Sequence, residues 1–163
     1  MQQTMHALIT ALENLLDLHG ELLGVEQKKL RSIIAQDWRE LETLLLESRK
    51  LLTTIELREK QRMEIVEHLC GRSDAPLSIV EKKLPESQQP RLRSCAQKLV
   101  KIISRQKLVS ENAQNLLKSS LEIINFSISL FSGGDGEGKT YSVNGQENGT
   151  EGRYTSLVFD IKA

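Results

Sequence analysis

The stretch MHALITALENLLDLHGEL, residues 5–22, decides the fold. Six of its positions recur at alternating spacings of three and four, and five of the six are apolar: Met5, Leu8, Leu12, Leu15, His19 and Leu22. Such spacing places side chains on one face of an α-helix. The pattern predicts a long amphipathic helix from about Gln3 to Ala35. Gly20 and Gly24 weaken this helix, and they indicate either the close approach of a neighbour or a bend.

A second long helix is predicted directly after the first. Asp37 has the spacing of a helix cap relative to Glu40, and Gly71 suits the residue that follows a helix. Glu59 and Arg62 lie on the apolar stripe of this helix, between Asp37 and Gly71. Polar residues at such positions indicate either a helix longer than its partner or buried ion pairs. The stripe comprises Trp38, Leu41, Leu45, Leu52, Ile55, Val66 and Leu69.

Residues 71–90 contain all three prolines of the chain, and this segment predicts a connector with one short helix, from about Leu77 to Leu84. A third long helix is predicted from about Pro90 to Phe131, with a length of about 60 Å. The predicted fold is therefore all-α. It is an elongated antiparallel bundle of three long helices plus one short helix, spanning residues 1–131.

The composition changes at Ser132. Seven of the ten glycines lie in residues 132–163, so this segment is predicted to be a Gly-rich, mostly disordered tail. Its end, Tyr154–Ile161, is nevertheless largely apolar, which is unusual for a tail without a function.

Charge and hydropathy exclude several classes of protein. The 22 basic residues balance 22 acidic residues, whereas nucleic-acid-binding proteins usually carry a basic excess. The N-terminus lacks the basic and apolar regions of a signal peptide, and no apolar stretch is long enough to span a membrane. Cys70 and Cys95 are expected to be reduced thiols. Together these features predict a cytoplasmic protein.

The sequence contains no convincing catalytic, metal or cofactor site. His6, His19 and His68 are badly spaced for one metal or one proton relay, and His19 is expected to be a hydrogen-bonded histidine in or near the core. Residues 133–140 formally match the phosphate-binding pattern G-x-x-x-x-G-K-[ST]. However, a phosphate-binding loop follows a buried strand, whereas a predicted helix precedes this match. A nucleotide-dependent enzyme is therefore the least supported interpretation of the sequence.

The end of the third long helix is unusually apolar. Nine of residues 116–131 are large and apolar, although one buried helix face needs about three in seven. Two stripes result, so the segment is either a helix buried on two sides or an exposed face that binds a partner helix. The first stripe comprises Leu117, Leu121, Ile124, Ile128 and Phe131, and the second comprises Leu116, Ile123, Phe126 and Leu130.

These residues carry a family resemblance. The segment from Asn112 to Ser127 resembles the C-terminal helix of FlgN-type flagellar export chaperones. The pairs Thr140-Tyr141 and Asn144-Gly145, the ending FDIKA at residues 159–163 and AQDWREL at residues 35–41 resemble the same family. One departure is Ser142, where the family frequently has glycine.

The resemblance implies a non-enzymatic chaperone of flagellar type III export. Its clients would be the hook-associated proteins FlgK and FlgL, whose amphipathic C-terminal helices would lie on the apolar residues of 116–131. Tyr141, Asn144 and Gly145 would then help the complex to dock on the cytoplasmic domain of the export-gate protein FlhA. The competing interpretation is a structural coiled-coil adaptor that associates with itself.

Overall fold

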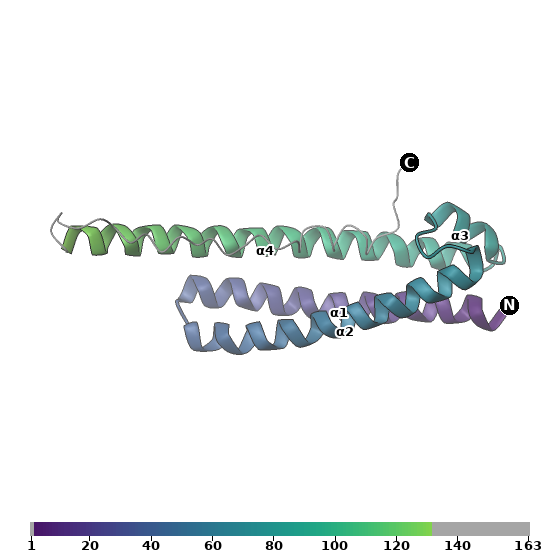
Figure 1. Ribbon diagram of the computed structural model, residues 1–163, viewed down its shortest axis with the longest axis horizontal. Coiled ribbons are helices and arrows are strands. Elements are labelled where there is room, and N and C mark those ends of the chain that lie inside the picture. The colour runs from purple at the N-terminus through teal and green to yellow at the C-terminus, as the bar shows by residue number, and fades with distance from the viewer. Residues whose placement is uncertain (1, 132–163) are drawn as a thin grey trace.

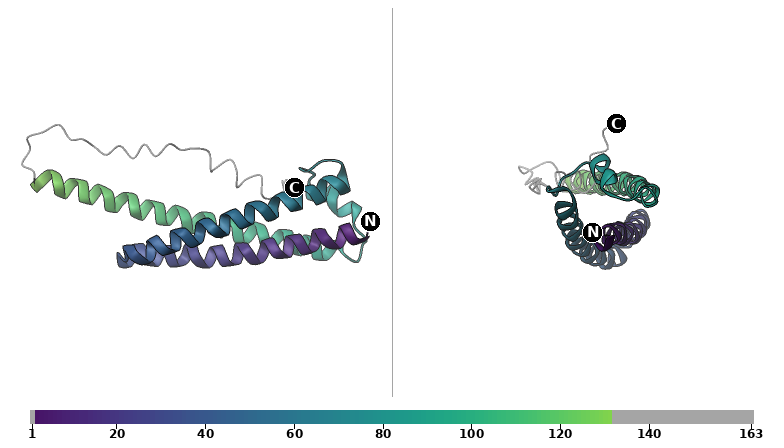
Figure 2. Two further views of the ribbon diagram at one scale, coloured as in Figure 1. Left: turned by 60° about the horizontal axis from the view of Figure 1, so that its bottom comes forward. Right: turned by 90° about the vertical axis from the view of Figure 1, so that its right-hand side faces the viewer.

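The computed structural model describes residues 2–131, which form four helices (Figure 1). These are α1 (Gln2–Ala35), α2 (Trp38–Cys70), α3 (Leu77–Lys83) and α4 (Gln89–Phe131). Helices α1 and α2 form an antiparallel hairpin, and α4 returns antiparallel to α2 and so runs in the direction of α1 (Figures 1 and 2). The predicted all-α bundle of three long helices and one short helix is confirmed.

A two-residue turn makes the hairpin. Gln36 has a φ of 58°, and the N–H of Asp37 donates to the carbonyl oxygen of Ser32 at 2.9 Å. The side chain of Asp37 then accepts a hydrogen bond of 3.0 Å from the N–H of Glu40. The left-handed residue closes α1 and the carboxylate caps α2. The helix start predicted at Asp37 is therefore confirmed.

Helix α1 is the central helix of the bundle, because it packs against both α2 and α4, whereas no Cα atoms in the described parts of α2 and α4 lie within 8 Å of each other. The short helix α3 contacts α2 and α4 and joins them at one end (Figure 1). Val80 of α3 is fully buried. Gly71 follows α2 with a φ of 77°, and Pro90 stands in the first turn of α4, where a missing N–H costs nothing.

The core consists of two apolar clusters along the bundle. The larger surrounds α3 and the first two thirds of α1, and it contains Met5, Leu8, Leu12, Leu15 and Leu22. The predicted stripe of α1 is thus confirmed. The smaller lies near the hairpin tip and consists of Ile33, Leu41 and Ala113, with Leu30 and Leu117 packed against it.

The predicted stripe of α2 is partly wrong. Trp38 and Leu45 are about half exposed, whereas Leu44 is buried in their place. Because α2 packs against α1 and α3 but not against α4, its buried face is narrow.

Buried polar residues of α1 lie between or beside the two clusters. His19 Nδ1 is 3.0 Å from Gln106 Oε1, and Gln106 Nε2 donates to the backbone oxygen of His19 at 2.6 Å. Ser48 donates to Glu26 at 3.1 Å, and Glu26 also accepts a hydrogen bond from Lys29 at 2.8 Å. The prediction that His19 is a hydrogen-bonded core histidine is confirmed. These bonds join α1 to α4 and to α2 and so fix how the helices align.

Two further predictions concern the glycines of α1 and the charged residues on the apolar stripe of α2. The close approach suggested for Gly20 and Gly24 is wrong, because an added Cβ at either position would meet no atom within 4 Å. Glu59 and Arg62 form a buried ion pair, with Arg62 Nε donating to Glu59 at 2.9 Å. The ion-pair interpretation of these two residues is therefore confirmed.

Candidate partner-binding site

Helix α4 projects beyond the rest of the bundle. It has 43 residues, against 34 in α1 and 33 in α2. Arg91 near its start pairs with Glu13 of α1 at 2.7 Å, so α4 starts close to the first turns of α1 and ends past the hairpin tip (Figure 1). Leu117 is the last α4 residue packed against either apolar cluster. We call residues 118–131 the overhang, which is about 21 Å long.

The large apolar side chains of the overhang are exposed. Phe131 is 92% exposed and Phe126 is 64% exposed, and the exposed set also includes Leu121, Ile123, Ile124, Ile128 and Leu130, together with Leu116 just before the overhang. Leu117 is half-buried at the hairpin tip. Within residues 2–131, no other helix therefore buries residues 118–131 on two sides. Contiguous exposed apolar surface on a small protein typically marks a binding site.

The two apolar stripes begin at Leu116 and Leu117 and run along the overhang. They differ in the residues that precede them on α4. The stripe of Leu117, Leu121, Ile124, Ile128 and Phe131, here called the inner stripe, continues the face that packs on the hairpin through Ala113. The stripe of Leu116, Ile123, Phe126 and Leu130, here called the outer stripe, follows exposed polar residues at the same helical position. These residues are Lys101, Arg105 and Asn112. The exposed Leu108 also lies at this helical position, so the outer stripe is mixed before residue 116 and mostly apolar only where α4 leaves the hairpin.

The sides between the stripes are polar but differ in character. Lys118, Asn125 and Ser129 are exposed on one side. On the other side Ser120 and Ser127 donate their hydroxyls to the carbonyl oxygens of Leu116 and Ile123, each at 2.9 Å. Because these hydroxyls are already satisfied within the helix, an apolar partner can cover them at little cost.

Sequence reasoning missed the apolar residues at the hairpin tip. Ile34 is 67% exposed, and Trp38 begins α2 beside the turn. The sequence did contain a signal for Ile34 and Trp38. The first helix is predicted to end at Ala35 and the second to begin at Asp37, which places both side chains at the end of a hairpin.

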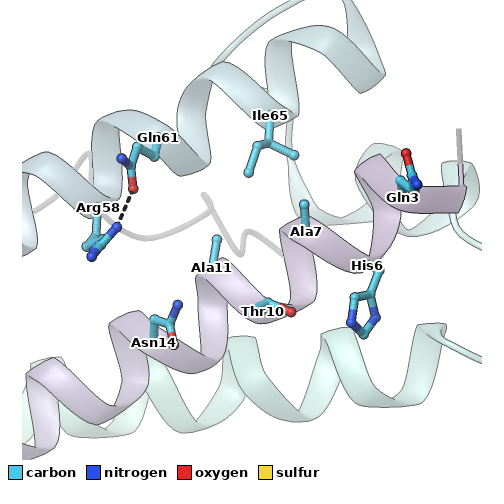
Figure 3. A pocket seen from close by; sticks show the side chains of 9 residues that line it. All are labelled: Gln3, His6, Ala7, Thr10, Ala11, Asn14, Arg58, Gln61 and Ile65. Atoms are coloured by element: carbon cyan, nitrogen blue, oxygen red, sulfur yellow. Dashed lines mark hydrogen bonds between the residues drawn. The ribbon is translucent and has the colours of Figure 1, made fainter.

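A hollow lies between α1 and α2 near the N-terminus, with a volume of about 450 Å³ (Figure 3). Arg58 and Gln61 of α2 form a hydrogen bond of 2.9 Å at its edge, and Ala7 and Ala11 of α1 face Ile65 across it (Figure 3). His6 is the one histidine among the residues that line it, and its ring points away from α2 (Figure 3). The hollow therefore offers no pair of groups for acid–base chemistry.

The histidine and cysteine residues form no reactive site. Burial lowers the pKa of His19, against the opposing effect of its hydrogen bond with Gln106. Burial raises the pKa of the Cys70 and Cys95 thiols, so both free cysteines are poor nucleophiles. Residues 2–131 contain no cluster of His, Cys, Asp or Glu that could hold a metal ion. None of the described helices is long and apolar enough to cross a bilayer.

Several residues predicted to be functional lie outside the described range. These are Tyr141, Asn144 and Gly145, together with the Gly-rich string at residues 133–140. The candidate site that the structure does describe is the overhang.

A helical bundle with one exposed, doubly apolar helix end defines a protein that binds other proteins. The sequence matches the model of the FlgN protein family over residues 1–149, and the chain belongs to that family. The resemblance carried by residues 112–145 is thereby confirmed. Membership identifies a non-enzymatic, cytoplasmic chaperone of flagellar export for the hook-associated proteins FlgK and FlgL. No curated protein and no solved structure matches the chain.

Proposed function

We propose that the inner stripe of the overhang is where this chaperone binds the amphipathic C-terminal helix of a hook-associated protein. The observation that carries this proposal is the exposure of Leu121, Ile124, Ile128 and Phe131 on a helix that has outrun its packing partners.

The geometry suits a single helix as the ligand. The inner stripe continues the face of α4 that packs on α1, so a client helix would lie where a longer α1 would have lain. The overhang matches about four turns of such a helix, and recognition would follow the helix-in-groove mode, with anchors spaced by three and four residues. Covering the stripe would also protect an aggregation-prone client helix from self-association.

We further propose that the complex is delivered to the cytoplasmic domain of FlhA through Tyr141, Asn144 and Gly145. The support is the resemblance of this element to that of other FlgN-type chaperones. Tyrosine also offers a large contact area with one polar end, as is common in short docking elements.

Calorimetry with a peptide of the C-terminal helix of FlgK or FlgL tests the proposal. The test variant is Ile124→Asp and the matched control is Asn125→Asp, which adds the same charge one residue away on the polar side of the overhang. Both positions are exposed, so both variants should fold. We expect Ile124→Asp to weaken binding by tenfold or more, about 1.4 kcal/mol, and Asn125→Asp to change it by less than threefold.

Equal effects of the two variants, or no binding by the folded wild-type protein, would remove the inner stripe as the site. Sedimentation of the free protein over a range of concentrations addresses the competing adaptor function. A stable oligomer that persists on dilution and is lost in Ile124→Asp would favour permanent self-association through the same stripe.

Tyr141→Ala separates delivery from client binding. We expect this variant to bind the client peptide with unchanged affinity, while its complex binds the cytoplasmic domain of FlhA more weakly. Wild-type affinity for FlhA would place the docking element elsewhere.

A further inference from the structure

The outer stripe is left uncovered when a client helix occupies the inner stripe. Ile123, Phe126 and Leu130 are each about two thirds exposed, and they lie on a different side of α4 from Ile124 and Ile128. A single straight helix therefore cannot cover both stripes. The outer stripe needs an occupant of its own.

The chain carries a segment with suitable chemistry after α4. In the sequence, Tyr154, Leu157, Val158 and Ile161 stand at spacings of three, four and seven from the first, which is the spacing of one apolar face of a helix. This segment follows a Gly-rich spacer, and it lies beyond residue 149, where the match to the FlgN family ends.

The length of the spacer fits the distance to be covered. Residues 132–153 separate the end of α4 from Tyr154, and a Gly-rich chain of that length has a root-mean-square span of about 26 Å. The outer stripe extends about 21 Å from Leu116 to Leu130. A ligand tethered at this distance has an effective concentration of the order of millimolar, so even a weak apolar contact would be populated.

We propose that the apolar segment Tyr154–Ile161 of the same chain docks on the outer stripe of the overhang. The segment covers Ile123, Phe126 and Leu130 and leaves the inner stripe open. The overhang then becomes the central helix of a small three-helix arrangement once a client binds, with the chain's own tail on one side and the client on the other.

Two-dimensional ¹H–¹⁵N NMR of the full-length protein without client tests this proposal. The reference is a synthetic peptide of residues 150–163, free in solution. The test variant is Phe126→Asp and the matched control is Ile124→Asp. We expect the amide signals of Leu157, Val158 and Ile161 to differ from those of the free peptide in the wild type and in Ile124→Asp. They should move to the free-peptide positions in Phe126→Asp.

Three outcomes would overturn the proposal. Wild-type signals that coincide with those of the free peptide would show that the segment does not dock. Equal movement of the amide signals in both variants would show that the segment Tyr154–Ile161 does not prefer the outer stripe to the inner stripe. Signals that return to the free-peptide positions on tenfold dilution would assign the contact to a second copy of the chain. Because no client is present, none of these outcomes bears on the proposed client site.

Discussion

At the scale of single residues, the contact between His19 and Gln106 is the main polar link between α1 and α4. Both side chains are buried, and the two residues are joined by two hydrogen bonds. Gln106 Oε1 must accept from His19 Nδ1, since the amide nitrogen of Gln106 is already used to donate to the His19 backbone. The pair therefore favours a histidine that carries a proton on Nδ1, and burial of the ring favours its neutral form.

The stability of the protein should therefore fall in mildly acidic solution. The pKa of His19 in the folded protein lies below its usual value of 6.5, because burial disfavours the charged ring. The unfolded chain takes up a proton near pH 6.5 and the folded protein only at lower pH. The free energy of unfolding should thus decrease as the pH falls below about 6.5, by at most about 1.4 kcal/mol per pH unit from this residue. Urea unfolding at pH 7.5 and pH 5.5 measures the decrease.

The other two histidines of the chain provide a control for this prediction. His6 and His68 are exposed, so His68→Gln should retain the pH dependence while His19→Gln should lose most of it. An identical loss of stability between the two pH values in both variants would rule out His19 as the cause.

Which residues are buried could be predicted well for α1 and less well for α2. Helix α1 is covered on two sides, by α2 and α4, so its wide apolar face is visible in the sequence. Helix α2 lacks contact with α4, and its narrow buried face lies among several leucines with similar spacing. Periodicity alone could not show that Leu44 is buried and Leu45 is exposed, because that depends on which neighbour is absent.

At the scale of elements, the ends of the helices follow from local chemistry. Asp37, Gly71 and Pro90 each act on the backbone next to them, so the predicted ends agree with the observed ends within about one residue. The end of α1 at Ala35 also agrees with the prediction, but there Gln36 and not a glycine takes the left-handed conformation. The short turn imposes that conformation, which could not be predicted from the residue type at position 36.

The cap at Asp37 should contribute measurably to the hairpin. We expect Asp37→Ala to lower the free energy of unfolding by about 1 kcal/mol, because the N–H of Glu40 loses its side-chain acceptor. Asp37→Asn keeps an acceptor oxygen and should cost less than half as much. Thermal or urea unfolding compares the two. Equal costs would show that the charge of Asp37, and not the hydrogen bond, stabilises the turn.

At the scale of the whole molecule, the overhang follows from helix lengths and alignment. The excess length of α4 could be estimated from the sequence, but its location could not. The buried bonds of His19 with Gln106 and the packing of Leu117 at the hairpin tip fix how α4 lies along α1, and both are long-range contacts. The sequence therefore left two interpretations of residues 116–131 open, and the alignment of the helices decides between them.

Removal of residues 132–163 should leave the bundle intact. Both apolar clusters lie within residues 5–117, so we expect circular dichroism to show an unchanged helical signal for residues 2–131 and a melting temperature within a few degrees of that of the full chain. A large decrease in melting temperature would show that the tail forms part of the core.

The measurement that tests the central claim most directly is hydrogen–deuterium exchange of the full chain with and without a peptide of the C-terminal helix of a hook-associated protein. Without the peptide, the amides of residues 118–131 should exchange faster than those of residues 92–113, because the overhang lies beyond both apolar clusters of the bundle. With the peptide, we predict strong protection of residues 118–131 and little change elsewhere in the bundle. Saturable binding with protection confined to α1 and α2, and none in the overhang, would contradict the claim that the projecting end of α4 is the client-binding site.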